Sequence, residues 1–390
     1  MTLAFADLGY PAEGVAPAPR DEGDELQVIK WSEAKEGFLL FPWCWIFEHG
    51  FGWINRFRRL ARDYTSLPAT RRFAFRRIRH LDAWLRSFLY FRVVTNHKES
   101  SEMSGLGTKV FISSDQHNGF GVSSTIIYGP TQALLVDSQF SLSNAHRLVA
   151  EILELDRDLT QIFISHVHPD HYLGLEVVKA AFPGARVIAY RDAADQINSA
   201  FEFKIDHWRT EILGKNGATT VTKVERIEDA QLSIDGEVIE IIGLLRGDSA
   251  DQTALWIPST KTLVAADTVF SDAHLWVADA RTPQDRQEWL DNLDRLESLK
   301  PETIIPGHAP ADRPYDPDGI GFTRRYLNDF IRELKASSDS ADLIARMDAR
   351  YPNLPVRVCL EYSARILRDG YHWDGDWPES LRKKDAVIEE

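Results

Sequence analysis

From about residue 108 onward, short apolar runs alternate with longer segments in which apolar residues recur every three or four positions. The short runs are typical of buried strands, and they lie at 110–112, 124–128, 133–137, 161–165, 186–190, 253–257, 262–265 and 302–306. The longer segments predict helices, and they lie at 143–155, 173–182, 201–208, 322–337, 340–350 and 356–367. Strands mixed with helices in this way predict an α/β fold, with mixed sheets covered by helices.

Two short motifs predict where elements turn or begin. Asp235-Gly236 stands between two strand-like runs, which is a strong signal for a tight β-hairpin. Thr282-Pro283, followed by Asp285, combines a capping residue, a proline at the first helical position and an acid in the first turn. A helix is therefore expected to begin at this point.

The N-terminal part of the chain has a different pattern. Apolar residues recur at helical spacing between Arg71 and Tyr90, and the segment from Arg56 to Arg92 holds eleven arginines against two aspartates. The pattern predicts an amphipathic helix with an arginine-rich face. Two interpretations stay open: a cap packed on the acidic remainder of the chain, or contact with a membrane surface or an anionic partner through residues 31–98.

We therefore expect three parts along the chain. The first, 1–100, is an N-terminal extension rich in arginine and aromatic residues. The second, 108–320, is the α/β domain, after a linker rich in glycine and serine. The third, 321–390, contains helices and a tail packed on the catalytic domain.

Composition excludes several classes of protein. The 390 residues carry a net charge of −14, so nucleic acid is not an expected partner. Cys44 and Cys359 are the only cysteines, which excludes a disulfide scaffold and a four-cysteine iron–sulfur cluster. Motifs of serine hydrolases and nucleotide triphosphatases do not occur. The start of the chain lacks the pattern of a secretory signal, so we expect a cytoplasmic protein, with membrane association left open.

The most informative motif is His166-Val-His168-Pro-Asp170-His171, directly after the strand predicted at 161–165. In an extended segment, the imidazoles of His166 and His168 point the same way and can hold one ion. Asp170 and His171 lie where the chain turns, and they can face a second ion. Three imidazoles and a carboxylate beside a buried strand would be costly without partners. The motif therefore predicts a metal site.

The motif and its context resemble the metallo-β-lactamase superfamily. The resemblance covers about residues 108–310 and extends to an acid after a strand (Asp137), a bridging aspartate at a strand end (Asp267) and a late histidine (His308). It implies an αββα sandwich of two mixed sheets flanked by helices, with a two-metal site at one edge. Asp137 would orient a ligand from behind.

One position departs from the family pattern. Where the family places a histidine after a glycine, this chain has Gly247-Asp248-Ser249, as in an uncharacterised subgroup of the family. Asp248 either binds the first ion through oxygen or only caps the turn. With Asp248 as a ligand, the resemblance implies a first site of His166, His168 and Asp248, a second site of Asp170, His171 and His308, and Asp267 as the bridge.

The implied cofactor is a pair of divalent ions, with Zn²⁺ expected and Mn²⁺ or Fe²⁺ as alternatives, because carboxylate oxygen suits these harder ions. The implied activity is hydrolysis by a bridging hydroxide of an ester, lactone, thioester or related bond in a small molecule. Asp170 would help orient the nucleophile. His274 would act on the substrate as an acid or hydrogen-bond donor, or else pack in a loop.

Two other functions stay open from the sequence. The first is an oxidoreductase of the same fold that uses a single iron, similar to the persulfide dioxygenases. The second is a membrane-associated protein with a weak metal site. Iron content with oxygen consumption would distinguish the first from a hydrolase, and binding to anionic vesicles would test the second.

Overall fold

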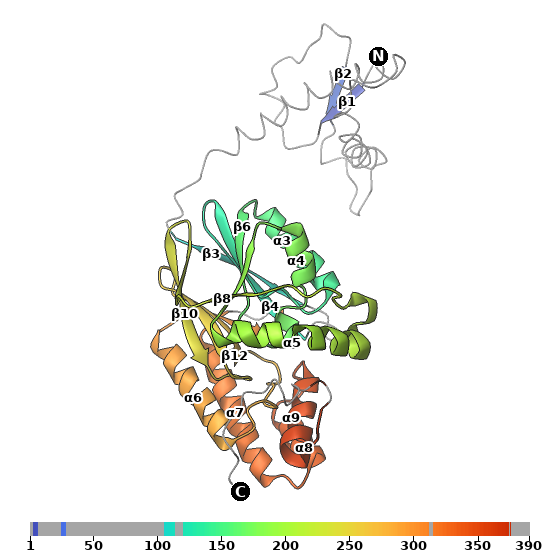
Figure 1. Cartoon of the computed structure of the whole chain (residues 1–390), viewed down its shortest axis with the longest axis vertical. Helices are drawn as coiled ribbons and strands as arrows, with labels where there is room; N and C mark the ends of the chain where they lie inside the picture. Colours follow the sequence, from blue (N-terminus) through green and yellow to red (C-terminus); the bar gives the residue numbers. More distant parts are fainter. Residues whose placement is uncertain are drawn as a thin grey trace. The chain divides into compact units, whose positions relative to one another are not determined.

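The computed structural model describes residues 3–6, 25–28, 105–113, 120–311, 315–373 and 375 (Figure 1). The chain forms two compact units, Met1–Ser100 and Ser101–Glu390. In the first unit, β1 (Leu3–Ala6) pairs in parallel with β2 (Glu25–Val28). The arginine-rich helix predicted between Arg71 and Tyr90 lies outside the described residues. The membrane contact through 31–98, the three-part division of the chain and the cytoplasmic location stay predictions.

The second unit contains two mixed sheets. The six-stranded sheet has antiparallel pairing among its first three strands and parallel pairing from the third onward. In spatial order its strands are β3 (Gly107–Ile112), β4 (Ser123–Tyr128), β5 (Gln132–Val136), β6 (Asp158–Phe163), β7 (Arg186–Tyr190) and β8 (Glu225–Ile227).

In the five-stranded sheet, one edge pair is parallel and the other pairs are antiparallel. In spatial order its strands are β13 (Thr303–His308), β12 (Thr262–Phe270), β11 (Gln252–Ile257), β10 (Glu237–Leu245) and β9 (Gln231–Ile234). The hairpin expected at Asp235-Gly236 joins β9 and β10. It is confirmed, since Gly236 adopts a positive φ of 84° that suits a tight turn.

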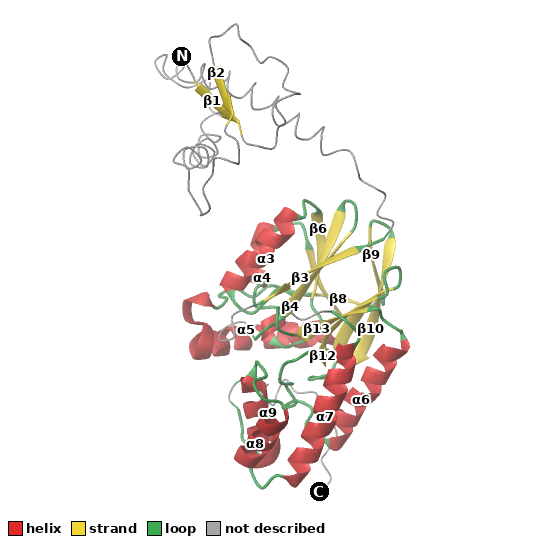
Figure 2. Ribbon diagram, turned by 180° about the vertical axis from the view of Figure 1, so that it is seen from behind, coloured by secondary structure: helices red, strands yellow, loops and turns green. Residues whose placement is uncertain are grey.

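Helices cover the outer faces of both sheets (Figure 2). They are α3 (Leu142–Glu154), α4 (Leu175–Ala181), α5 (Asp192–Trp208), α6 (Pro283–Ser298), α7 (Asp318–Ala336), α8 (Ser340–Arg350) and α9 (Arg357–Asp369). Short turns are η4 (Pro169–His171), η5 (Arg209–Leu213) and η6 (Gly214–Asn216). The capping box at Thr282 and Asp285 starts α6 as expected. The helix predicted at 201–208 begins earlier, at Asp192, because Ala193 and Ile197 continue its buried face.

Three apolar clusters hold the layers together. One lies between the sheets and joins residues such as Val136 and Ile188 to Ile241 and Ile305. A second packs α3–α5 against the six-stranded sheet. The third packs α6–α9 against the five-stranded sheet. The αββα sandwich and the helical C-terminal segment are therefore confirmed. Among the described residues, none of the helices has the length and apolar character needed to cross a bilayer.

The topology brings chemistry-bearing side chains to one edge of the sandwich. Asp137 directly follows β5, and the His166–His171 motif follows the parallel neighbour β6. Asp267 lies in β12, and His308 ends its parallel neighbour β13. Because the carboxyl ends of parallel strands lie on the same side of a sheet, residues far apart in sequence meet there.

Candidate metal centre

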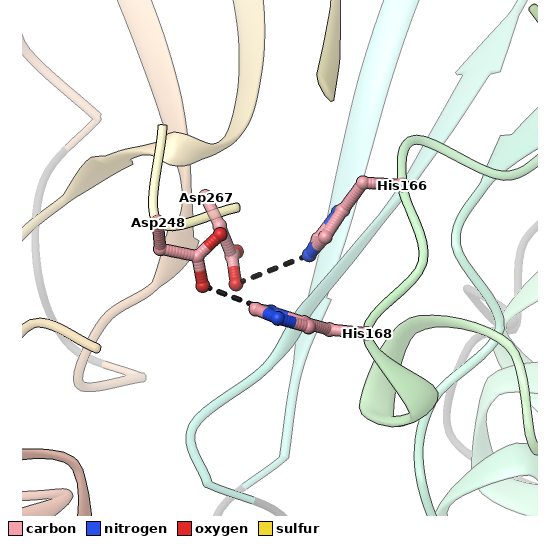
Figure 3. Close-up of side chains that lie close together, drawn as sticks. All are labelled: His166, His168, Asp248 and Asp267. Carbon is pink, nitrogen blue, oxygen red and sulfur yellow. Dashed lines mark ion pairs between the residues drawn. The ribbon is translucent and has the colours of Figure 1, made fainter. Parts of the chain in front are cut away.

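Seven buried or nearly buried side chains form two adjacent groups at this edge. One group comprises His166, His168, Asp248 and Asp267, and the other comprises Asp170, His171 and His308. Within each group, the atoms able to bind a metal all lie within 4.8 Å of one another. Figure 3 shows the first group, with both histidines projecting from the segment after β6 toward the two aspartates. The structure therefore brings together all seven of the residues predicted as metal ligands.

Asp267 occupies the position between the groups. Its Oδ2 lies 3.5 Å from Nε2 of His166, 3.3 Å from Nε2 of His171 and 3.1 Å from Nε2 of His308. Oδ2 of Asp170 lies 3.5 Å from Nε2 of His308. Ligands at about 2.1 Å from a tetrahedral ion are about 3.4 Å apart, so these separations match the edges of a coordination tetrahedron.

Each imidazole is held by its outer nitrogen. Nδ1 of His171 lies 2.8 Å from Oδ2 of Asp137, and Nδ1 of His308 lies 2.9 Å from the carbonyl oxygen of Phe120. Both contacts require a donor at Nδ1, so Nε2 is the nitrogen of each ring that faces the centre. The outer contacts of the remaining imidazoles are with Ser165 Oγ (His166 Nδ1, 2.8 Å) and with Asp279 Oδ2 (His168 Nε2, 3.2 Å). This arrangement is typical of metal-binding histidines.

Three of the inner atoms lack partners. Nε2 of His166, Nε2 of His171 and Oδ1 of Asp267 are buried and have no hydrogen-bond partner in the described structure. A buried polar atom without a partner costs about 1–3 kcal/mol, so three such atoms on residues of one centre indicate a missing ligand. Imidazole nitrogen and carboxylate oxygen together suit Zn²⁺, Mn²⁺ or Fe²⁺. The residues present therefore fit a pair of divalent ions.

The electrostatics of the centre favour cations. Burial opposes the charge of Asp267, but His171, His308 and His166 outweigh it and hold the pKa of this carboxyl well below its usual range. Burial raises the pKa of Asp248 to about 7, with repulsion from Asp267 adding to the shift and His168 opposing it. Burial, followed by repulsion from His171, lowers the pKa of His166 to about 4. Buried carboxylates so close together need positive charge beside them.

Asp248 faces the first group with one oxygen. Its Oδ2 lies 2.9 Å from Nδ1 of His168, and its Oδ1 accepts a hydrogen bond from the amide of Gln252. The Gln252 amide is oriented in turn, because its Oε1 accepts from Thr268 Oγ1 at 3.1 Å. Gln252 thus holds one oxygen of Asp248 and leaves Oδ2 directed at His168 in the first group. A carboxylate that only capped the turn would contact backbone N–H groups of the turn. Here both oxygens of Asp248 contact other side chains.

Gly307, directly before His308, has no room for a side chain. A Cβ atom on Gly307 would collide with Oδ1 of Asp267. Ala266, just before this aspartate, has a positive φ of 45°, a strained value for alanine. The close approach of β13 and the strained residue in β12 therefore both serve the placement of Asp267.

Asp137 supports the centre from behind, as the resemblance implied. Its Oδ1 accepts from the backbone N–H of Ser165 at 2.9 Å, and its Oδ2 lies 2.8 Å from both Ser165 Oγ and His171 Nδ1. One carboxylate thus links the end of β5 to the start of the histidine motif.

His274 is placed away from both groups. It is buried, and its Nδ1 lies 2.7 Å from the hydroxyl of Tyr326 on α7, while its backbone N–H donates to the carbonyl of Pro355. These contacts join the segment after β12 to the C-terminal helices. Its action on the substrate stays a prediction, and the structure places it in a packing contact.

The burial of His274 predicts a measurable effect of pH on stability. Burial lowers the pKa of His274 to about 4, whereas the unfolded chain protonates it near 6.5. Between these values the unfolded state binds the extra proton, so the free energy of unfolding falls as pH decreases, by at most about 3 kcal/mol. Urea unfolding at pH 7, 6 and 5 should show a weaker pH dependence in His274→Gln. His146→Gln, at an exposed position on α3, is the matched control and should keep the dependence of the unchanged chain.

Asp279 was not among the site residues predicted from the sequence. Its Oδ2 accepts from Trp276 Nε1 at 2.8 Å and lies 3.2 Å from Nε2 of His168. Burial opposes its charge, but His168 and Trp276 outweigh it and lower the pKa of Asp279 to about 2. An acid three residues after a tryptophan carries no recognisable spacing, so nothing in the sequence pointed to it.

Asp279→Asn should weaken metal binding at the first group. Loss of the negative charge behind His168 leaves its ring less firmly oriented and less basic, and such supporting contacts typically change metal affinity by about 10- to 100-fold. Competition titration against a chromogenic chelator measures the change. Trp276→Phe removes only the second donor to Asp279 and should have a smaller effect. Equal affinities in Asp279→Asn and the unchanged protein would contradict this role.

Comparisons with known proteins found similarity to one family model and to solved structures. Residues 117–308 match the family model described as the metallo-beta-lactamase superfamily. None of the curated proteins matches the chain. Among solved structures, a metallo-beta-lactamase family protein from Thermus thermophilus is 18% identical, with 69% of this chain and 95% of that chain covered and a TM-score of 0.48. A metallo-beta-lactamase from Pontibacter korlensis is 19% identical, with 59% and 97% covered and a TM-score of 0.41.

The DIM-1 metallo-beta-lactamase exposed to ceftazidime is also 19% identical, with 61% of this chain and 96% of that chain covered and a TM-score of 0.43. The family match spans the strands that carry Asp137, the histidine motif, Asp267 and His308. The same residues form the two buried His/Asp groups. Residues 117–308 therefore match the metallo-β-lactamase superfamily, and they contain the His/Asp site of a metallo-hydrolase.

Proposed function

We propose that this protein hydrolyses an ester, lactone, thioester or related bond in a small molecule with the help of two divalent ions. His166, His168 and Asp248 would hold the first ion, Asp170, His171 and His308 would hold the second, and Asp267 would contact both. The observation that carries the proposal is the position of Asp267 Oδ2, within 3.1–3.5 Å of three imidazole nitrogens from both groups.

When bound, two divalent ions lower the pKa of a water held between them and polarise an electrophilic centre. The chain contributes orientation. Asp137, Asp279 and Phe120 hold three imidazoles by their outer nitrogens, so the inner nitrogens need no rearrangement before they bind. Preorganisation of this kind is the usual contribution of a protein to a catalytic metal site.

Asp170 is the carboxylate that solvent reaches most easily within the centre. Its side chain is 13% exposed, whereas the side chains of Asp267 and Asp248 are each 1% exposed. A carboxylate at the open side of the centre can accept a hydrogen bond from an attacking water and orient it toward the substrate. We therefore assign this role to Asp170.

Metal quantification and a substrate panel test the proposal together. Protein purified without chelator should contain about two equivalents of transition metal, of which Zn²⁺ is expected, with Mn²⁺ or Fe²⁺ also accepted because Asp248 adds oxygen. Chromogenic esters, lactones, thioesters, phosphodiesters and β-lactams should then reveal hydrolysis that chelation abolishes and metal restores.

Three results would overturn the proposal. Protein that contains no transition metal and takes up none after dialysis would exclude a metal-dependent hydrolase. Protein that holds a single iron and consumes oxygen with a persulfide would support the oxidoreductase alternative instead. Binding of the full chain to anionic vesicles at low salt, without metal uptake, would favour the membrane-associated alternative.

A further inference from the structure

Four aromatic rings follow one another beside the metal-ligand groups. Ring centroids are 6.3 Å apart for Phe120 and Trp208, 5.6 Å for Trp208 and Trp373, and 5.4 Å for Trp373 and Trp276. The rings come from four separate parts of the chain: the segment before β4, the end of α5, the segment after α9, and the segment between β12 and α6. We refer to these four residues as the aromatic arc.

The two ends of the aromatic arc contact different metal-ligand groups. At one end, the carbonyl oxygen of Phe120 accepts from Nδ1 of His308 at 2.9 Å. At the other end, the ring of Trp276 lies 6.3 Å from that of His168, and its Nε1 donates to Asp279. The arc therefore runs from a residue of the second group to a residue of the first.

The aromatic arc does not belong to a single core cluster of the sandwich. Phe120 and Trp208 pack against the cluster on the six-stranded sheet, whereas Trp276 packs against the cluster on the five-stranded sheet. All four rings are only half-buried. Partly exposed aromatic rings next to a few converging polar groups are the common lining of small-molecule sites.

The position of Trp373 is built by contacts with α5. The buried Lys204 donates to the carbonyl of Gly375 at 2.7 Å, and its Nζ lies 5.5 Å from the centroid of the Trp373 ring. A Cβ atom on Gly375 would collide with the rings of Trp373 and His207. The segment after α9 thus lies against α5 with one indole ring in a defined place.

We infer that the aromatic arc holds a planar, uncharged aromatic group of the substrate, next to the bond that is cleaved. The inference rests on the proposed function and narrows its substrates to aryl or conjugated cyclic esters, lactones and thioesters. Flat groups gain ring–ring contacts that a saturated group of the same size does not. The charged groups beside the arc are already paired, Asp279 with His168 and Trp276, and Lys204 with Gly375, which suits an uncharged group.

Binding measurements on the full chain test the inference, with and without its metal. The probes are N-methyl-2-naphthamide and its fully saturated decahydronaphthalene counterpart, titrated by calorimetry. The aromatic probe should bind about fivefold to tenfold more tightly than the saturated one, in both metal states. Trp373→Ala should reduce this ratio to below about twofold, and Trp373→Phe should retain most of it. Tyr371→Ala, on the same segment but outside the arc, is the matched control and should keep the full ratio.

A second variant distinguishes loss of the aromatic arc from misfolding. Gly375→Ala keeps every ring but displaces Trp373, so it should lower the ratio as Trp373→Ala does, and circular dichroism confirms that each variant is folded. Aromatic binding with this variant pattern, but without hydrolysis of any ester, would support the arc and refute the proposed function. Hydrolysis that proceeds while both probes bind equally, or while folded Trp373→Ala and Gly375→Ala keep the full ratio, would overturn the inference and leave the proposed function standing.

Discussion

Asp267→Asn is expected to abolish metal binding at both groups while keeping the size and shape of the side chain. In the unchanged protein, Oδ2 of Asp267 lies within 3.1–3.5 Å of three imidazole nitrogens, and its negative charge is the one that both groups share. Contacts that only support a ligand already change affinity by about 10- to 100-fold, so loss of a shared ligand should exceed about 100-fold. Elemental analysis after purification without chelator should find well under one metal ion per chain.

The matched control for this change is Asp206→Asn. Asp206 is exposed on α5 and belongs to neither group, so the control variant should bind metal like the unchanged protein. If Asp267→Asn retained two ions per chain, the proposed arrangement with a shared carboxylate would be wrong.

Asp137→Asn is expected to destabilise the fold and to weaken the second group together. The buried carboxylate accepts from the backbone N–H and hydroxyl of Ser165 and from Nδ1 of His171. Asparagine replaces one acceptor oxygen with an amide NH₂ group. This donor would then face the buried donors of Ser165 or His171. We expect the free energy of unfolding to fall by about 2–4 kcal/mol. Metal affinity at the second group should fall by about 10- to 100-fold.

Urea unfolding of chelated and metal-loaded protein separates the two effects. Ser165→Ala removes the hydroxyl contacts with Asp137 and with Nδ1 of His166 but leaves the contact between Asp137 and His171 intact. Its free energy of unfolding should therefore fall by about 1.5 kcal/mol in the chelated state. A loss as small as this in Asp137→Asn would show that the carboxylate does not link β5 to the histidine motif as described.

Much of the fold could be predicted because its signals are local. Buried strands read as continuous apolar runs, and the hairpin at Asp235-Gly236 and the capping box at Thr282 each depend on a few adjacent residues. The start of α5 could not be placed so well, because its first turns are polar on the outside and bury small alanines such as Ala193. Small side chains give a weak apolar signal even where they pack well.

In the metal centre, too, local patterns could be predicted and contacts between distant segments could not. His166 and His168 could be identified together because their spacing in an extended segment determines that both rings point the same way. Asp248 was ambiguous, since a Gly-Asp-Ser turn is ordinary local chemistry. Its contacts with His168 and Gln252 join segments that are distant in sequence, and only the packed sheets bring those segments together.

By itself, the sequence determined the class of fold, the order of its elements and the residue types of a metal site, because each depends on short-range pattern and on the cost of burying polar groups. Only the tertiary structure decided how closely Asp267 approaches the histidines of both groups, that Asp279 supports His168, and that His274 packs against Tyr326. It also decided that four aromatic residues from distant segments meet beside the centre. Such contacts arise from the close packing of strands and helices, and no local pattern in the chain records which side chains that packing brings together.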